Sequence, residues 1–131
     1  MIRFTLLAFL ALGLFSASNA RAQSLTEVRT QLQAALQRSL GRSMVNGALP
    51  HLDLTTGELT SFYPTENHEI ILKMANVYVM CATLTTADGR EATVDYYMTQ
   101  TGTSYGVIRT EINNRAPLKA LMDSGKAIRL E

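Results

Sequence analysis

The sequence contains few of the residues that most often carry chemistry. Its 131 residues include one cysteine, Cys81, and two histidines, His51 and His68. A single cysteine cannot form an internal disulfide, so the fold must be held together by its core or by a partner subunit. Two histidines and one cysteine are also little material for a metal site, which needs several such side chains to converge. We therefore expect neither a metal nor another cofactor.

Motifs typical of enzymes are missing as well. The chain has no Gly-rich phosphate loop, and His68-Glu69 lacks the second histidine of a zincin helix. If the chain folds back after residue 57, His51 and Asp53 would approach Glu66 and His68. Polar residues on an exposed strand and turn explain this pattern better. We predict no catalytic residues from the sequence.

Charge of one sign is not in excess. The chain has 12 basic and 11 acidic residues, and its lysines and arginines form no cluster. A near-neutral surface of this kind disfavours binding to nucleic acid or to anionic lipid. The expected partners are instead a protein or a small apolar ligand.

Only one apolar run is long enough to notice, and it lies at the amino terminus. Arg3 precedes Phe4–Phe15, and Ala20-Arg21-Ala22 follows. This run of about 12 residues is shorter than the roughly 20 that span a bilayer. The pattern predicts a secretory signal peptide over 1–22, cleaved after Ala22.

Cleavage would leave one small domain over 23–131, without stable membrane insertion. Cleavage removes Arg3 and Arg21 from the 12 basic residues, so 10 remain. Against 11 acidic residues they give the mature chain a net charge of −1. We expect the mature chain to be exported to the periplasm or the outside.

The stretch from Asn76 to Ile112 predicts three antiparallel strands joined by two hairpins. Asp88-Gly89 favours a two-residue type I′ turn. Counted outward from that turn, Cys81 lies opposite Tyr96.

The second hairpin turns near Gly102. A three-residue loop centred on this glycine sets Asp95 opposite Arg109, as a cross-strand ion pair. A two-residue loop instead sets Asp95 against Ile108.

The Asp88-Gly89 turn and the three-residue loop at Gly102 together divide the side chains between two faces, because alternate residues of a strand share a side. The predicted core face carries apolar residues and the cysteine: Val77, Val79, Cys81, Val94, Tyr96, Met98, Ile108 and Ile112. The opposite face combines apolar side chains with the Asp95–Arg109 pair, as binding surfaces often do. The predicted binding residues on it are Tyr78, Met80, Tyr97, Val107, Asp95 and Arg109.

Helical patterns flank the predicted sheet. Ser24 and Glu27 form a capping box at the start of an amphipathic helix, which Gly41 would end. Pro117 suits the first turn of a second, shorter helix, and Gly125 would end it. The final segment, 126–131, alternates like a short edge strand.

The stretch between the first helix and the sheet is less regular. Residues 48–63 predict a hairpin that turns at Thr55-Thr56-Gly57. Residues 64–68 are polar and predict an interruption. Residues 69–74 suit a buried strand or one short helix, and the adjacent Ile70 and Ile71 favour the strand.

Together these elements predict an α+β domain, in which an N-terminal amphipathic helix packs on an antiparallel β-meander and a short helix and strand follow. In shape only, this arrangement is similar to cystatin and to small NTF2-type domains, where a curved meander grips a helix. No motif accompanies the similarity, so it implies no function.

Two functions follow as hypotheses. The first is an exported, non-catalytic binding or protein-interaction module that acts through one face of its sheet, with a second copy of itself as one candidate partner. The second is a small envelope enzyme with a pocket between helix and sheet, for which Tyr63, Glu66, His68 and Asp95 are the candidates. The missing catalytic motifs favour the first.

Overall fold

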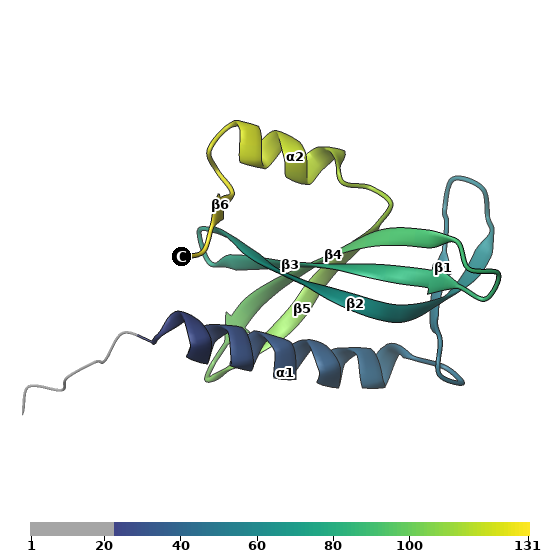
Figure 1. Cartoon of the computed structure of the whole chain (residues 1–131), viewed down its shortest axis with the longest axis horizontal. Helices are drawn as coiled ribbons and strands as arrows, with labels where there is room; N and C mark the ends of the chain where they lie inside the picture. Colours follow the sequence, from purple (N-terminus) through teal and green to yellow (C-terminus); the bar gives the residue numbers. More distant parts are fainter. Residues whose placement is uncertain (1–22) are drawn as a thin grey trace, which may run out of the picture.

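The structure, a computed structural model, describes residues 23–131, so the predicted signal peptide lies outside the described part. These residues form an α+β domain with two helices and a six-stranded antiparallel sheet (Figure 1). The elements are α1 (Leu25–Ser43), β1 (Leu49–Leu52), β2 (Leu59–Met74), β3 (Val77–Thr86), β4 (Glu91–Thr101), β5 (Ser104–Ile112), α2 (Ala116–Asp123) and β6 (Ile128–Arg129). Neither helix within 23–131 has the length and apolar character needed to cross a membrane.

Helix α1 begins at the predicted capping box. The Ser24 side chain accepts a hydrogen bond from the Glu27 amide, and the Glu27 carboxylate accepts one from the Ser24 amide. The predicted end at Gly41 is wrong. The helix continues to Ser43, and the Met44 amide donates to the carbonyl of Leu40. Because Met44 packs against the main core, the last turn is held by packing.

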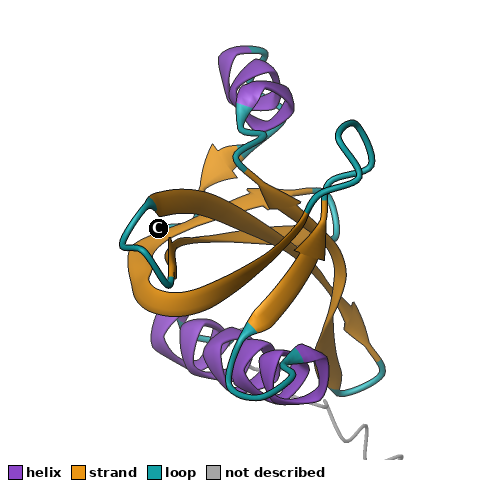
Figure 2. Cartoon of the chain, turned by 90° about the vertical axis from the view of Figure 1, so that its right-hand side faces the viewer, coloured by secondary structure: helices purple, strands orange, loops and turns teal. Residues whose placement is uncertain are grey.

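The sheet curves around α1, so one of its faces is concave and the other convex. Figure 2 shows α1 against one side of the sheet and α2 beyond the other. The strands lie in the order β1-β2-β3-β4-β5, and β6 pairs with β2. The main core lies between α1 and the concave face, and its most deeply buried members are Leu32, Leu36, Leu84, Val94 and Met98.

Strand β2 contains the segment that was predicted to interrupt the chain. Residues 64–68 lie inside this strand, although its pairing with β3 shifts between Pro64 and Glu66 and again between Asn67 and Ile71. Polar residues are tolerated here because the side chains of 64–67 are exposed, while Pro64, Glu66 and Asn67 keep their partners on β3. The predicted strand over 69–74 is confirmed.

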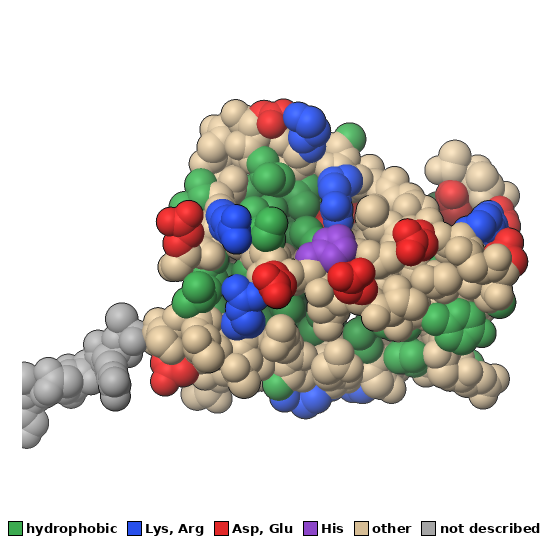
Figure 3. Space-filling model, viewed as in Figure 1, with side chains coloured by type: hydrophobic (Ala, Val, Ile, Leu, Met, Phe, Trp, Pro, Cys, Tyr) green, Lys and Arg blue, Asp and Glu red, His purple; other side chains and the backbone are tan. Residues whose placement is uncertain are grey.

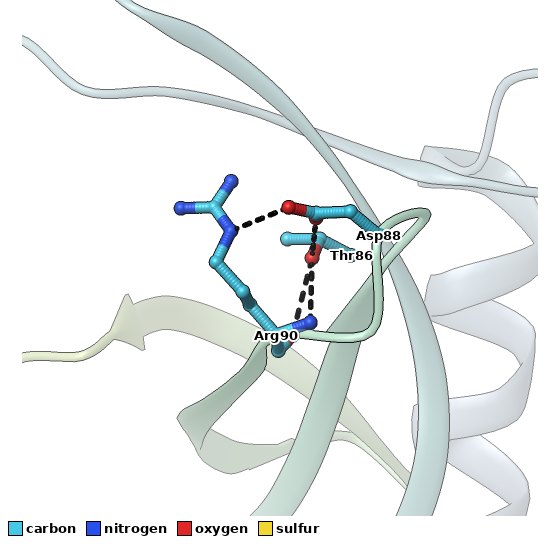
Figure 4. Close-up of polar contacts among 3 residues, drawn as sticks. All are labelled: Thr86, Asp88 and Arg90. Atoms are coloured by element: carbon cyan, nitrogen blue, oxygen red, sulfur yellow. Dashed lines mark hydrogen bonds and ion pairs between the residues drawn. The ribbon is translucent and has the colours of Figure 1, made fainter.

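The β3–β4 turn corrects the predicted register. The loop has three residues, because Thr86 and Arg90 pair across it and the Gly89 amide donates to the carbonyl of Thr86. The Thr86 hydroxyl donates to the Asp88 carboxylate and accepts from the Arg90 amide, as Figure 4 shows. Gly89 has φ +88°, as a glycine in a type I turn with a following bulge does.

This one-residue difference exchanges the two faces of β3. Cys81 lies opposite Asp95 rather than Tyr96, and Val79 opposite Tyr97. The side chains of β3 that pack toward α1 are therefore those that were predicted to face away.

The β4–β5 hairpin matches neither predicted loop. Its two-residue loop is Gly102-Thr103, with Thr101 paired to Ser104. The register shifts between Tyr97 and Met98, where β5 holds one extra residue, Ile108. Asp95 therefore lies opposite Glu111, so both predicted partners are wrong.

The C-terminal segment covers part of the convex face. Helix α2 carries Pro117 in its first turn, as predicted, and ends just before Gly125. Residues 128–129 form the expected edge strand beside β2. A second core lies under this segment and consists of Leu72, Val79, Tyr97, Leu118 and Ala127.

Candidate functional site: an open end of the convex face

The six predicted binding residues do not share a face. Three of them belong to the concave side: Met80 is 2% exposed in the main core, and Tyr78 and Val107 pack against it. The other three, Asp95, Tyr97 and Arg109, lie on the convex side. The prediction of one shared surface is wrong for two reasons. The β3 register was predicted one residue out of step, which misplaced Tyr78 and Met80. The β4–β5 loop differs from the predicted one, so Val107 lies opposite Met98 rather than Tyr97.

Tyr97 is a core residue of the convex side. It is 8% exposed, and it packs with Leu118 of α2 and Val79 of β3. Figure 3 shows hydrophobic side chains gathered between α2 and the sheet. This end of the convex face is covered by the protein's own C-terminal segment.

An ion pair between half-exposed Arg115 and buried Asp95 fixes the start of α2 to the sheet. Arg115 donates from Nη2 to Asp95 Oδ1 at 2.7 Å and from Nε to Oδ2 at 3.3 Å. Asp95 is 1% exposed, and its pairing with Arg115 keeps the pKa of the guanidinium above its ordinary value. Arg109, the predicted partner, pairs instead with Glu111 on its own strand. The Asp95–Arg115 pair positions a helix, and the Asp95 carboxylate is therefore not free to act as a catalytic acid or base.

Cys81 lies beside this ion pair in a setting that suppresses its reactivity. Burial, together with a hydrogen bond to the Asp95 side chain, raises the thiol pKa to about 12. A thiol, unlike a thiolate, is a poor nucleophile and a poor metal ligand. Its predicted place on the core face beneath α1 is wrong, because it borders the second core.

The polar residues of the β1–β2 region do not converge. His68 Nε2 lies 3.1 Å from the Thr83 hydroxyl, while the ring of His51 lies 6.1 Å from that of Phe62. Within residues 23–131 no three His, Cys, Asp or Glu side chains are placed to hold a metal ion. Glu66 and Tyr63 do line a common groove, so two of the four candidates for an enzyme site meet.

The other end of the convex face is open and apolar. Here Val45 is 60% exposed, Leu59 67% and Tyr63 41%. With Pro50 they line a hollow of about 320 Å³ on the outer side of the β1–β2 hairpin. We call these four residues the Tyr63 surface.

A groove adjoins the Tyr63 surface along β2. It has a volume of about 410 Å³ and runs between the C-terminal part of α1 and residues 63–67, so Tyr63 borders both hollows. On the side away from β3, β2 pairs with β1 over Leu59–Phe62 and with β6 at Leu72 and Lys73. Between these two partners the described chain places no strand beside β2.

The sequence contained a signal for this surface. Leu59, Ser61 and Tyr63 alternate, so they share one side of the hairpin's return strand. Whether that side faces a core or solvent depends on how far the C-terminal segment reaches over the convex face, and no local pattern sets that distance.

Comparison with known proteins adds no relative. No family model, no curated protein and no solved structure matches this chain.

Proposed function

We propose that the protein is an exported, non-catalytic interaction module that binds another protein through the Tyr63 surface. The observation that supports this proposal is the cluster of exposed apolar side chains at the uncovered end of the convex face. Export rests on the signal-like pattern of residues 1–22.

An exposed aromatic side chain between two hollows is a typical binding anchor. Tyr63 has a rigid ring that buries a large area at low entropic cost, and a hydroxyl that stays hydrogen-bonded at an interface. The neighbouring Val45 and Leu59 supply further apolar area. Contiguous exposed apolar surface of this kind on a soluble protein usually marks an interaction site.

The edge of β2 over residues 63–68, beside which the described chain places no strand, supports a protein as the occupant. Strand edges present amide and carbonyl groups that an extended segment can bind. The groove beside residues 63–67 offers room for its side chains. Tyr63 and Glu66 in the same groove are both exposed, so the groove lacks the enclosure that strengthens electrostatic interactions in a closed active site.

Site-specific photo-crosslinking tests the proposal. We expect the full chain, expressed in its own host with benzoylphenylalanine in place of Tyr63, to give a discrete adduct after irradiation. The matched control carries the same group in place of Leu54, which is 90% exposed in the β1–β2 turn but borders neither hollow. Absence of an adduct at 63, or equal adducts at both positions, would contradict the proposal.

A substitution tests whether Tyr63 holds the captured partner, and the mass of the adduct identifies that partner. With benzoylphenylalanine in place of Leu59, Tyr63→Ser should reduce the yield of the adduct at least tenfold. Leu54→Ser should leave this yield unchanged. An adduct with twice the mass of the mature chain would identify a second copy of the protein as the partner.

A further inference from the structure

A polar hollow lies at the opposite end of the sheet from the Tyr63 surface. It opens between the tips of the β2–β3 and β4–β5 hairpins and has a volume of about 590 Å³. The Thr99 hydroxyl donates to the carbonyl of Asn76 at 3.0 Å and ties the two tips together. The hollow is lined by Lys73, Ala75, Asn76, Tyr78, Thr99, Gln100 and Gly102.

Its lining suits a negatively charged ligand. Lys73 is the only charged residue among the seven, and no carboxylate accompanies it. Within residues 23–131, Lys73 takes part in none of the ion pairs. The amides of Asn76 and Gln100 add hydrogen-bond donors on the exposed rim.

The ammonium group of Lys73 is held in place. Its Nζ lies 5.5 Å from the centroid of the Tyr78 ring, within the range of a cation–π contact. Tyr78 in turn meets the ring of Tyr105 edge-on, at 5.5 Å between centroids and 87° between planes. Because Tyr105 is only 6% exposed, this chain of contacts connects the charge to the main core.

The backbone at the rim is strained. Ala75 has φ +47°, a left-handed conformation that residues with a Cβ rarely adopt. The two-residue Ala75-Asn76 loop between the paired residues Met74 and Val77 requires this conformation, and it keeps the hairpin tip at the rim compact.

We propose that this hollow binds a small oxyanion, a carboxylate or phosphate group, through Lys73 and the Asn76 and Gln100 amides. This is a second site, independent of the Tyr63 surface. Lysine serves as a compact point charge for such groups, and neutral amide donors complete their hydrogen bonding without adding a competing negative charge. The ring of Tyr78 beside Lys73 offers an apolar surface that an apolar part of the ligand can contact.

NMR titration of the mature chain tests this site, with inorganic phosphate in one arm and acetate in the other at constant ionic strength. We expect amide shifts confined to residues 73–78 and 99–103. Whichever arm gives the tighter binding names the preferred group. Lys73→Met should weaken binding at least tenfold, and Gln100→Ala should weaken it several-fold without affecting the fold.

The matched control is Lys126→Met, which removes an exposed lysine outside the hollow. It should leave the affinity unchanged. Absence of shifts in both arms overturns the proposal, as does equal weakening by Lys73→Met and Lys126→Met, because general charge attraction would then explain the binding. If Lys73→Met fails to fold, Gln100→Ala against Lys126→Met decides the question.

Discussion

At the scale of single residues, Tyr96 is the least satisfied member of the main core. It is 2% exposed, and its hydroxyl has no hydrogen-bond partner among residues 23–131. Burial raises its pKa to about 12, so the group remains neutral. A buried donor without a partner has lost its water and gained nothing in return.

Tyr96→Phe should therefore leave the free energy of unfolding unchanged or raise it by up to about 1–2 kcal/mol. Urea unfolding of the two proteins measures the difference. As a control for sensitivity, Met98→Ala on the same face should lower the free energy of unfolding by about 2–5 kcal/mol, because Met98 is 0% exposed. Marked destabilisation by Tyr96→Phe would reveal a partner for the hydroxyl.

The sequence predicted the concave side of β4 correctly at this scale. Val94, Tyr96 and Met98 alternate, and all three are core residues. The same reasoning failed for Tyr78 and Met80, because their side depends on the turn that precedes β4. Alternation identifies which residues share a face within one strand, while the assignment across strands requires the loop.

At the scale of elements, α2 depends on one polar contact. The Arg115 side chain is 40% exposed, whereas that of Asp95 is 2% exposed, so loss of the arginine leaves a carboxylate buried without its partner. The apolar contacts of α2 are few, since Leu118 is its only fully buried residue.

Arg115→Ala should lower the free energy of unfolding by about 2–3 kcal/mol and speed hydrogen exchange of the amides in 118–129. The matched control is Lys119→Ala, which breaks an exposed pair with Asp123 in the same helix and should cost under about 0.5 kcal/mol. Equal effects of the two substitutions would show that the buried pair contributes nothing special.

The elements themselves were largely predictable, and their registers were not. The capping box, the amphipathic stripe and Pro117 act locally, so the helices began where expected. Asp88-Gly89 suits both a two-residue turn and a three-residue turn that ends in a glycine bulge. The three-residue turn that the structure adopts carries hydrogen bonds of the Thr86 hydroxyl. The sequence pattern alone did not include these bonds.

At the scale of the whole molecule, one sheet separates two unequal cores. The fold class followed from the order of the elements, because a helix before an antiparallel meander has a broad face to cover. The open end of the convex face did not follow, since it depends on sheet curvature and on the reach of α2. Both are properties of the assembled chain.

Acid should destabilise the protein through carboxylates whose pKa values are lowered in the fold. Backbone hydrogen bonding by Thr55 lowers the pKa of Asp53, the Thr86 hydroxyl lowers that of Asp88, and the Asn114 amide lowers that of Glu111. Their stabilisation is complete above the ordinary values of 3.8 for Asp and 4.5 for Glu, and it is lost as the pH falls through the lower folded values.

We expect the melting temperature to be nearly constant from pH 7 to about 5 and to fall below that. Circular dichroism melts at each pH measure it, and Asp88→Asn should flatten part of the fall. A melting temperature that rises as the solution is acidified would contradict the assignment.

The three-residue loop between β3 and β4 has a consequence for how this protein tolerates change over generations. Loops usually gain and lose residues freely. If one codon were gained or lost and the turn kept its three-residue geometry, every β4 position would shift by one, and Asp95 and Tyr97 would turn to the side that faces α1. Substitution of Ala87 can be absorbed, but lineages that keep this fold should preserve the length of the loop and Gly89, whose φ of +88° other residues rarely adopt.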